Sequence, residues 1–84
     1  MTPTPRVRRG VRLIVDRPSG RTMLLGPERG LFLDAAARRI VELLDGGRTL
    51  DAIVEALAAP APREVVRRDV AAFLEALARR GMIE

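Results

Sequence analysis

The segment ERGLFLDAAARRIVELL, residues 28–44, constrains the fold of this chain most strongly. Its first part, as far as Leu33, is short and apolar and is typical of a β-strand. Asp34 follows at once and is a residue type that caps helices, after which apolar residues recur at helical spacing: Ala37, Ile40, Val41 and Leu44. No loop fits between the two elements, so we expect a strand that runs straight into a helix, with a groove between them.

Two further strands precede this segment. GVRLIVD, residues 10–16, alternates apolar side chains on one face, and RPSG, residues 17–20, is a turn signal. The strands are therefore expected at about residues 11–16, 21–25 and 29–33. Because short turns join them, they should form an antiparallel meander whose first and third strands are edges.

The two predicted edges differ in how they are protected. The first edge strand carries or follows three arginines, whose charge disfavours pairing with another chain: Arg8, Arg9 and Arg12. The third carries Leu31, Phe32 and Leu33 without such a guard. Since an unprotected edge leaves backbone N–H and C=O groups free, an extended peptide could add to the third strand.

Three amphipathic helices follow, at about residues 35–44, 50–58 and 62–80. We expect the glycines after Asp45 to supply the left-handed C-cap of the first, and Thr49 to cap the second. Gly81 should end the third helix, so that Met82 and Ile83 can fold back on the core. The order predicts an α+β, winged helix-turn-helix-like fold, formed by a single domain over residues 10–84 after a flexible arm over residues 1–9, ordered at most near Val7.

Side-chain alternation predicts apolar residues on both faces of the sheet. If Leu31 and Leu33 face the core, Phe32 faces away, and we expect Ile14 and Leu24 to do the same. Single exposed apolar residues are common, or the arm could cover them. A second contact surface, for self-association or for a partner protein, explains the pattern equally well.

The residues that are missing exclude most chemistry. The chain has no His, Cys, Lys, Tyr or Trp, so it lacks a side chain that titrates near neutral pH and the usual strong nucleophiles. Ser19 is the only serine and has no base beside it. We therefore expect no enzyme activity, no metal and no cofactor. The absence of cysteine agrees with a cytoplasmic location, and no apolar run is long enough to cross a membrane.

Several segments of the chain resemble those of a known family. The most specific segments are LLGPERGLFLD, residues 24–34, and DGGRTLDAIV, residues 45–54, with a more generic match in DVAAFLEALARRGMI, residues 69–83. They are similar to the pyrroloquinoline quinone (PQQ) peptide chaperones, the PqqD family, which is the prototype of the recognition elements for ribosomally made, modified peptides (RiPPs). Gly26 stands where that family's pattern would have Ala, a change that affects only a turn.

The resemblance implies a function and a site. Family members bind the PQQ precursor peptide without a cofactor and present it to a radical S-adenosylmethionine (SAM) enzyme, which cross-links a Glu and a Tyr of the peptide. The peptide is implied to lie as a strand along the third strand, against the first helix. The residues implied for backbone pairing are Gly30, Leu31, Phe32 and Leu33, and those for the helix side are Ala36, Arg39, Ile40 and Leu43. Arg38 or Arg39 could attract acidic side chains of the peptide.

Other readings remain open. The net charge of +4 also fits a winged-helix DNA-binding protein that contacts phosphates through Arg63, Arg67 and Arg68, although the third helix lacks the Asn, Gln and Ser that commonly read bases. A recognition domain of another RiPP pathway and a structural oligomerising module are further alternatives. We favour the peptide carrier, with neither nucleic acid nor membrane as a partner, and leave a domain-swapped homodimer open.

Overall fold

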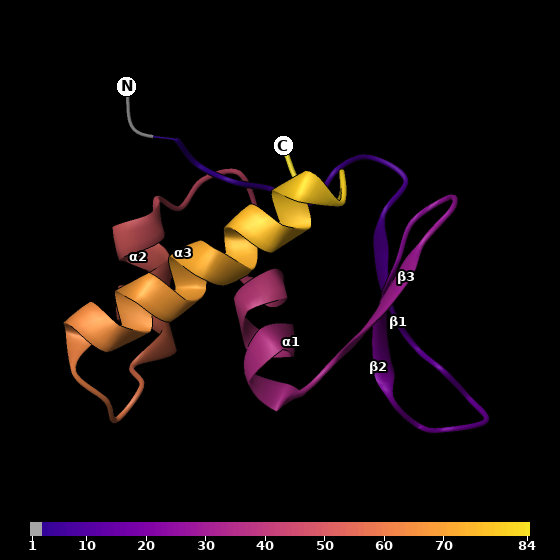
Figure 1. Cartoon of the computed structure of the whole chain (residues 1–84), viewed down its shortest axis with the longest axis horizontal. Coiled ribbons are helices and arrows are strands. Elements are labelled where there is room, and N and C mark those ends of the chain that lie inside the picture. Colours follow the sequence, from indigo (N-terminus) through magenta and orange to yellow (C-terminus); the bar gives the residue numbers. More distant parts are fainter. Residues whose placement is uncertain (1–2) are drawn as a thin grey trace.

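The computed structural model describes residues 3–84 and has three strands followed by three helices (Figure 1). The elements are β1 (Arg12–Val15), β2 (Thr22–Leu25), β3 (Gly30–Leu33), α1 (Ala35–Glu42), α2 (Leu50–Leu57) and α3 (Arg63–Arg79). The predicted α+β class and element order are thus confirmed. The observed ends lie within two residues of the expected ones, which is the usual scatter of element ends.

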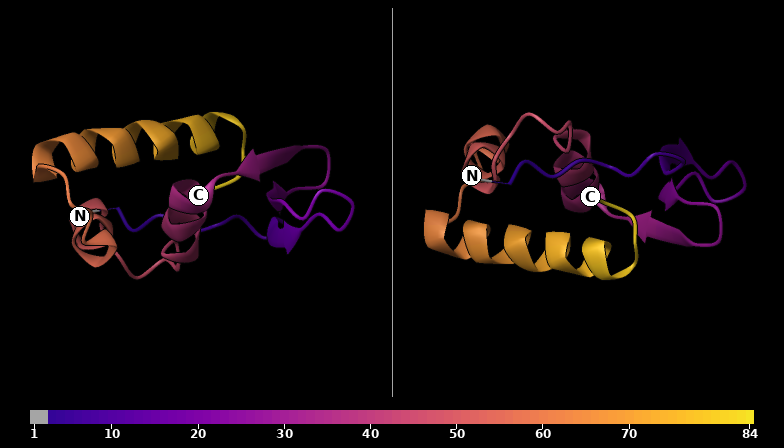
Figure 2. Two further views of the ribbon diagram at one scale, coloured as in Figure 1. Left: turned by 90° about the horizontal axis from the view of Figure 1, so that it is seen from below. Right: turned by 90° about the horizontal axis from the view of Figure 1, so that it is seen from above.

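The elements are arranged along the long axis of the molecule (Figures 1 and 2). The sheet forms one end, α2 and the first turns of α3 form the other, and α1 lies between them. The long helix α3 runs along one side and ends near the sheet. The C-terminal part of α3 is therefore brought towards strands that lie more than forty residues earlier in the chain.

The sheet is an antiparallel meander in the order β1-β2-β3, so β2 is central and β3 is an edge. Leu24 lies opposite Leu13 on one side and Leu31 on the other, and it is fully buried. The expectation that Leu24 faces away from the core is therefore wrong. Met23 takes the outer position, because it is the residue that lies opposite Ile14 and Phe32.

Helix starts follow the sequence closely, whereas one helix end does not. Asp34 caps α1, since its Oδ1 accepts the Ala37 N–H at 2.8 Å, and Thr49 caps α2. The left-handed glycine expected at the end of α1 is not its C-cap. Leu43 holds that position in right-handed helical geometry, and the positive φ of 80° belongs to Gly46 further on. The extra residues let the chain turn before α2.

The C-terminal residues pack as predicted. Gly81, with φ of 69°, ends α3 in the left-handed conformation that glycine tolerates best. The Met82 N–H then donates to the Leu77 carbonyl at 3.0 Å, and Met82 is only 2% exposed. The chain therefore folds back and closes one end of the core.

The N-terminal arm is bonded to the rest of the molecule where the structure describes it. Arg6 and Glu84 exchange backbone hydrogen bonds of 3.1 and 2.9 Å, and the Arg8 N–H donates to Met82 at 2.9 Å. Val7 pairs with Ile83 and packs against the core. Residues 1–2 lie outside the described part, and mobility of the arm remains a prediction.

One hydrophobic core joins the layers. Its fully buried members Leu24, Ile53 and Leu77 come from β2, α2 and α3. Among residues 3–84, no helix is both long and apolar enough to span a bilayer.

Candidate functional site

The outer edge of β3 presents free backbone groups. The Gly26 N–H donates to the Arg29 carbonyl at 2.7 Å, which makes these residues a hydrogen-bonded pair. Hydrogen-bonded and non-hydrogen-bonded pairs alternate in an antiparallel ladder, so the next bonded pairs are Leu24 with Leu31 and Thr22 with Leu33. The N–H and C=O groups of Gly30 and Phe32 therefore point away from β2, towards the open edge.

The same alternation divides the predicted β3 residues into two classes. Gly30 and Phe32 offer backbone groups to a guest strand. Leu31 and Leu33 direct their backbone groups to β2 and their side chains to the core, where Leu33 is 7% exposed and Leu31 is half-buried. Pairing through Leu31 or Leu33 is thus less favourable than the resemblance implies, and it remains a prediction.

The Phe32 side chain lies on the outer face of the sheet and not in the groove beside α1. It is 40% exposed, and the guanidinium of Arg21 stacks over its ring at 4.0 Å from the centroid. Such a cation–π contact holds the ring on that face. Phe32 therefore contributes its backbone, rather than its ring, to the edge next to α1.

Three of the predicted α1 residues come together in one cavity of about 290 Å³: Ala36, Arg39 and Ile40. Most of the lining is apolar, and Arg39 is anchored there because its Nη1 donates to the Leu57 carbonyl at 3.1 Å. Ile40 is 9% exposed, so its main contribution is to the core and only a small part of it lines the cavity. The mostly apolar lining, with Arg39 and Asp69 as its two charged residues, suits an apolar side chain.

Arg38 and Leu43 lie elsewhere. The Arg38 side chain donates to Glu42 at 3.4 Å and to the Thr22 hydroxyl at 3.5 Å, so its charge is already balanced. Leu43 is the C-cap of α1 and packs against the core. Of the two arginines expected to attract acidic side chains, Arg39 is the better placed.

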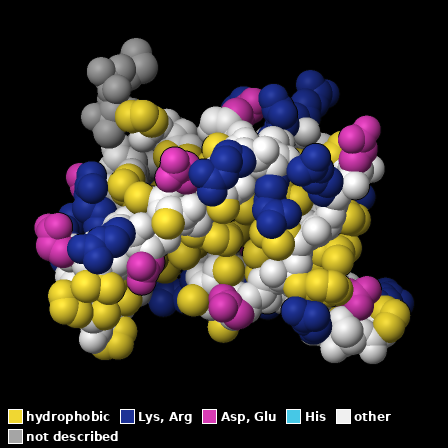
Figure 3. Space-filling view, viewed as in Figure 1, with side chains coloured by type: hydrophobic (Ala, Val, Ile, Leu, Met, Phe, Trp, Pro, Cys, Tyr) yellow, Lys and Arg dark blue, Asp and Glu magenta, His cyan; other side chains and the backbone are white. Residues whose placement is uncertain are grey.

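The structure adds a wall from α3 that sequence reasoning missed. Val66, Asp69 and Val70 line the same cavity as Ala36 and Arg39, and Phe73 continues that face of the helix at the next turn, half-buried. Figure 3 shows hydrophobic side chains gathered in the middle of this face of the molecule, between α3 and the sheet. All the apolar residues of this α3 stripe also pack in or against the core, so the sequence pattern gave no separate signal of a second role.

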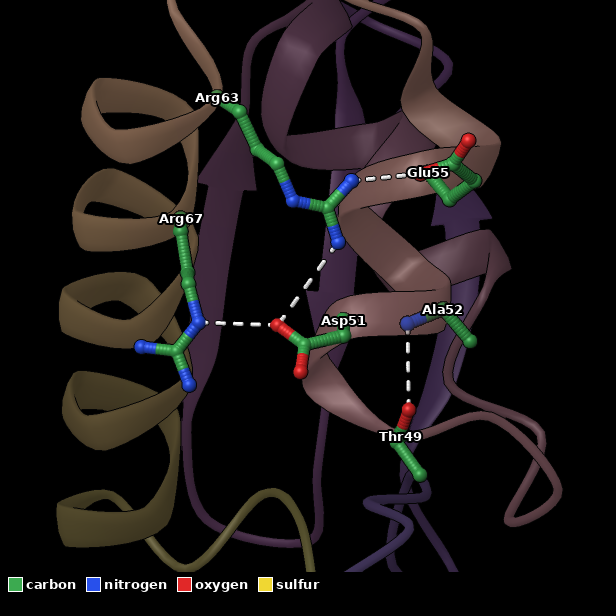
Figure 4. Close-up of polar contacts among 6 residues, drawn as sticks. All are labelled: Thr49, Asp51, Ala52, Glu55, Arg63 and Arg67. Atoms are coloured by element: carbon green, nitrogen blue, oxygen red, sulfur yellow. Dashed lines mark hydrogen bonds and ion pairs between the residues drawn. The ribbon is translucent and has the colours of Figure 1, made fainter.

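Two of the arginines needed for a DNA-binding face are held by carboxylates (Figure 4). Arg63 bonds Glu55 at 2.5 Å, and Arg67 bonds Asp51 at 2.9 Å. The hydrogen bond to Glu55 and its negative charge raise the pKa of Arg63 above its usual value. Their positive charge is thus compensated within the α2–α3 face, which makes this surface a poor anchor for phosphates. Within residues 3–84, no group of three or more acidic side chains could hold a metal ion.

Comparison with known proteins gives consistent matches. Residues 21–83 match the family model described as coenzyme PQQ synthesis protein D (PqqD). The chain is 45% identical over 78 residues to a PqqA binding protein of Rhizobium meliloti, covering 90% of this chain and 80% of the relative. It is also 34% identical to the bifunctional coenzyme PQQ synthesis protein C/D of Methylorubrum extorquens over 95% of this chain, which corresponds to 22% of that longer protein.

Solved structures extend these matches to the fold. The PqqD part of Methylobacterium extorquens PqqCD, described as a functional and stand-alone RiPP recognition element, superposes with a TM-score of 0.78 at 34% identity, covering 95% of this chain and 87% of that one. TbiB1, solved in complex with the TbiA(beta) leader peptide, gives a TM-score of 0.79 at 29% identity, covering 94% of each chain.

Proposed function

The chain belongs to the PqqD family, and from that premise we propose that it is a non-catalytic peptide carrier in PQQ biosynthesis. It binds the ribosomally made precursor peptide, the PqqA that its relatives are named for binding, by adding the peptide as a strand to β3. It then presents the peptide to a radical SAM enzyme in the cytoplasm. The chain itself supplies no catalytic group and no cofactor.

The observation that carries this proposal is the open edge of β3. The outward N–H and C=O groups of Gly30 and Phe32 can pair with an extended peptide, and each such hydrogen bond contributes only about 0.5–1.5 kcal/mol. A disordered peptide loses entropy on binding, so backbone pairing alone is too weak. The cavity between α1 and α3 supplies the apolar burial that makes up the difference.

This division of labour fits a carrier. The main-chain bonds hold any extended segment in register, and the cavity beside Ala36, Arg39 and Val66 selects a side chain that fits it. Binding that depends on a few residues is reversible, so the peptide can be passed on to the enzyme that modifies it.

The second candidate function is recognition of a different modified peptide. It is favoured by the similarity to TbiB1, whose leader-peptide complex has the same fold at a comparable TM-score. The DNA-binding alternative is less favourable, because Arg63 and Arg67 already pair with Asp51 and Glu55.

The decisive experiment is a titration of ¹⁵N-labelled protein with PqqA peptide of Rhizobium meliloti, followed by NMR. We expect the amide resonances of Gly30 and Phe32, and those around Arg39 and Val66, to shift most. Shifts confined to the solvent face of α3, at Glu64, Arg68 and Ala72, would contradict the proposed site. Stronger binding of the TbiA(beta) leader than of PqqA would favour the second candidate function.

A further inference from the structure

A second cavity, of about 450 Å³, opens at the start of β3 and is strongly basic. Its lining includes arginines from three different parts of the chain: Arg8 of the arm, Arg29 of the β2–β3 turn, and Arg79 and Arg80 at the end of α3. Glu28 is its only carboxylate. Four arginines against one glutamate leave a formal charge of +3 around one cavity.

This charge is largely uncompensated inside the molecule. Within residues 3–84, no carboxylate lies within 4.0 Å of the guanidinium of Arg8, Arg29 or Arg80. Arg79 is 3.8 Å from Glu75, with both side chains at least 70% exposed, so that pair is weak. By contrast, the arginines facing α2 are paired, and Figure 3 shows dark blue side chains above the hydrophobic area, near the end of α3.

Helix electrostatics explain only part of the cluster. Cations in the last turn of a helix interact favourably with its dipole, which accounts for Arg79 and Arg80. Arg8 and Arg29 belong to no helix and are brought in by the fold. Arg8 donates to the Gly81 carbonyl at 3.4 Å through one Nη, which leaves most of its five donors free.

The position of the cavity favours a ligand that belongs to the guest peptide. Arg29 immediately precedes Gly30, so a strand added along β3 must run one of its ends past this cavity. The floor contains the buried side chains of Val11 and Met82, which suits the methylene groups of an acidic side chain better than a phosphodiester. The basic cavity therefore adjoins the end of the open edge, since Arg29 lines it and Gly30 begins β3.

We propose that this basic cavity binds carboxylate side chains of the guest peptide, in the residues that flank the segment paired with β3. The inference rests on the proposed function and goes beyond it, since it names an acidic flank as a requirement for recognition. Arg29 and Arg80 act as the principal contacts, because they have no partner carboxylate within 4.0 Å and come from two different elements, the β2–β3 turn and the end of α3.

The test measures the Kd of fluorescently labelled PqqA peptide of Rhizobium meliloti for wild-type protein and for the double variant Arg29→Glu/Arg80→Glu. We expect about tenfold weaker binding at about 50 mM NaCl, and a much smaller difference at about 500 mM NaCl, since salt screens exposed charges. The matched control is the double variant Arg17→Glu/Arg68→Glu, an equal charge change at two exposed positions outside the cavity, which should leave Kd within about twofold.

A second peptide links the effect to carboxylates. PqqA peptide with its Asp and Glu residues changed to Asn and Gln should bind the wild type about tenfold more weakly than the unmodified peptide does. This amide peptide should bind the double variant no more weakly than it binds the wild type. If the double variant binds the acidic peptide as tightly as the wild type does, the inference is wrong. The ratio of the double variant's Kd to the wild-type Kd should be smaller for the amide peptide than for the acidic peptide. Equal ratios for the two peptides would overturn the inference.

Two readouts keep the result interpretable. Absence of wild-type binding at either salt concentration, or binding that is indifferent to changes in β3, counts against the proposed function and not against this cavity alone. If the double variant does not fold by circular dichroism, the Nε–H resonances of Arg29 and Arg80 in wild-type protein decide. They should shift on adding the acidic peptide, and unchanged resonances, or shifts produced only by duplex DNA, reject the inference.

Discussion

At the residue scale, the Arg39 side chain both bonds the backbone of α2 and lines a cavity at the surface. Its guanidinium is fastened to the Leu57 carbonyl and still lines the cavity that it shares with Asp69. Because Arg presents five donors in a fixed fork, one bond to the backbone leaves others for a ligand. Sequence spacing alone does not distinguish Arg39 from Arg38, which is occupied by Glu42.

The prediction for this residue is that Arg39→Glu weakens PqqA binding about tenfold or more, since it puts a negative charge in a site expected to take acidic side chains. Isothermal calorimetry measures the change. Arg38→Glu is the matched control and should have a smaller effect, because it lies outside the cavity. Equal losses for both variants would mean that general surface charge, and not the cavity, governs binding.

The Asp45 carboxylate makes the stability of the fold depend on pH. It accepts the Gly47 N–H at 2.9 Å and pairs with Arg48, and these contacts, the backbone bond first, lower the pKa of Asp45 below its ordinary 3.8. A carboxyl with a lowered pKa in the folded state stabilises the protein above the pKa of the unfolded state, and this contribution is lost as pH falls through the folded value.

We therefore expect the free energy of unfolding to decline below about pH 4 by more in the wild type than in Asp45→Asn. Urea unfolding curves between about pH 5 and pH 2 measure this difference, and an NMR titration of the Asp45 carboxyl carbon gives its pKa directly. Parallel acid curves for the two proteins would show that Asp45 titrates normally.

At the element scale, the junction of β3 and α1 determines where a guest strand can lie. The Asp34 side chain caps α1 immediately after the last residue of β3, so strand and helix meet without slack. A single residue, Asp34, thus connects the strand that carries Gly30 and Phe32 to the helix whose Ala36 lines the cavity. A loop at this point would allow the two halves of the site to move apart.

The prediction at this scale concerns one backbone donor. Phe32→Pro should abolish peptide binding, because proline removes the N–H that points outward from the edge of β3. It should leave pairing with β2 largely intact, since that N–H is not directed at β2. Calorimetry measures binding, and circular dichroism confirms the fold.

Phe32→Ala is the matched control, because it removes the ring and its contact with Arg21 but keeps the N–H. It should bind within a few fold of the wild type. If alanine at this position eliminates binding as completely as proline does, then the ring on the outer face, together with Ile14 and Met23, is the true contact surface.

At the scale of the whole molecule, the N-terminal arm and the C-terminal residues are hydrogen-bonded to each other beside the core. Hydrogen bonds connect the arm to two distant places, Arg6 to Glu84 and Val7 to Leu44. Val7 and Ile83 form a bridge and pack against the core, so we expect loss of these bonds to expose both side chains. The arm is also part of the basic cavity through Arg8.

Removal of residues 1–7 should therefore destabilise the domain by about 2–4 kcal/mol, from several hydrogen bonds and the burial of Val7. For a domain of this size each kcal/mol shifts Tm by about 4–8 °C, which calorimetry resolves easily. Arg6→Ala removes only the exposed ion pair with Glu84 and should cost less than about 1 kcal/mol. An unchanged Tm on truncation would show that the arm is mobile, as the sequence predicted.

The outer face of the sheet leaves self-association as a prediction at this scale. Ile14, Met23 and Phe32 form an apolar surface there that nothing in the described chain covers completely. Light scattering with and without PqqA peptide would distinguish a monomer from a domain-swapped homodimer.

The sequence by itself determined the features that depend on neighbouring residues. Alternation and turn residues specified the meander with β3 as an edge strand, and Asp34 and Thr49 specified two helix starts. These follow from local sterics and hydrogen bonding, which act over a few positions. Side-chain parity failed at β2, where both faces are apolar and the register is set by the neighbouring strands, so that Leu24 rather than Met23 is buried.

Only the tertiary structure decided which distant segments share the site. The α3 wall beside Arg39 and the basic cavity that joins Arg8 to Arg80 bring together residues far apart in sequence. No periodicity records such proximity, because it results from how α3 packs across the core and where Gly81 turns the chain back. The local pattern therefore predicts the edge at which we propose that a peptide binds, whereas packing determines which side chains lie beside that edge.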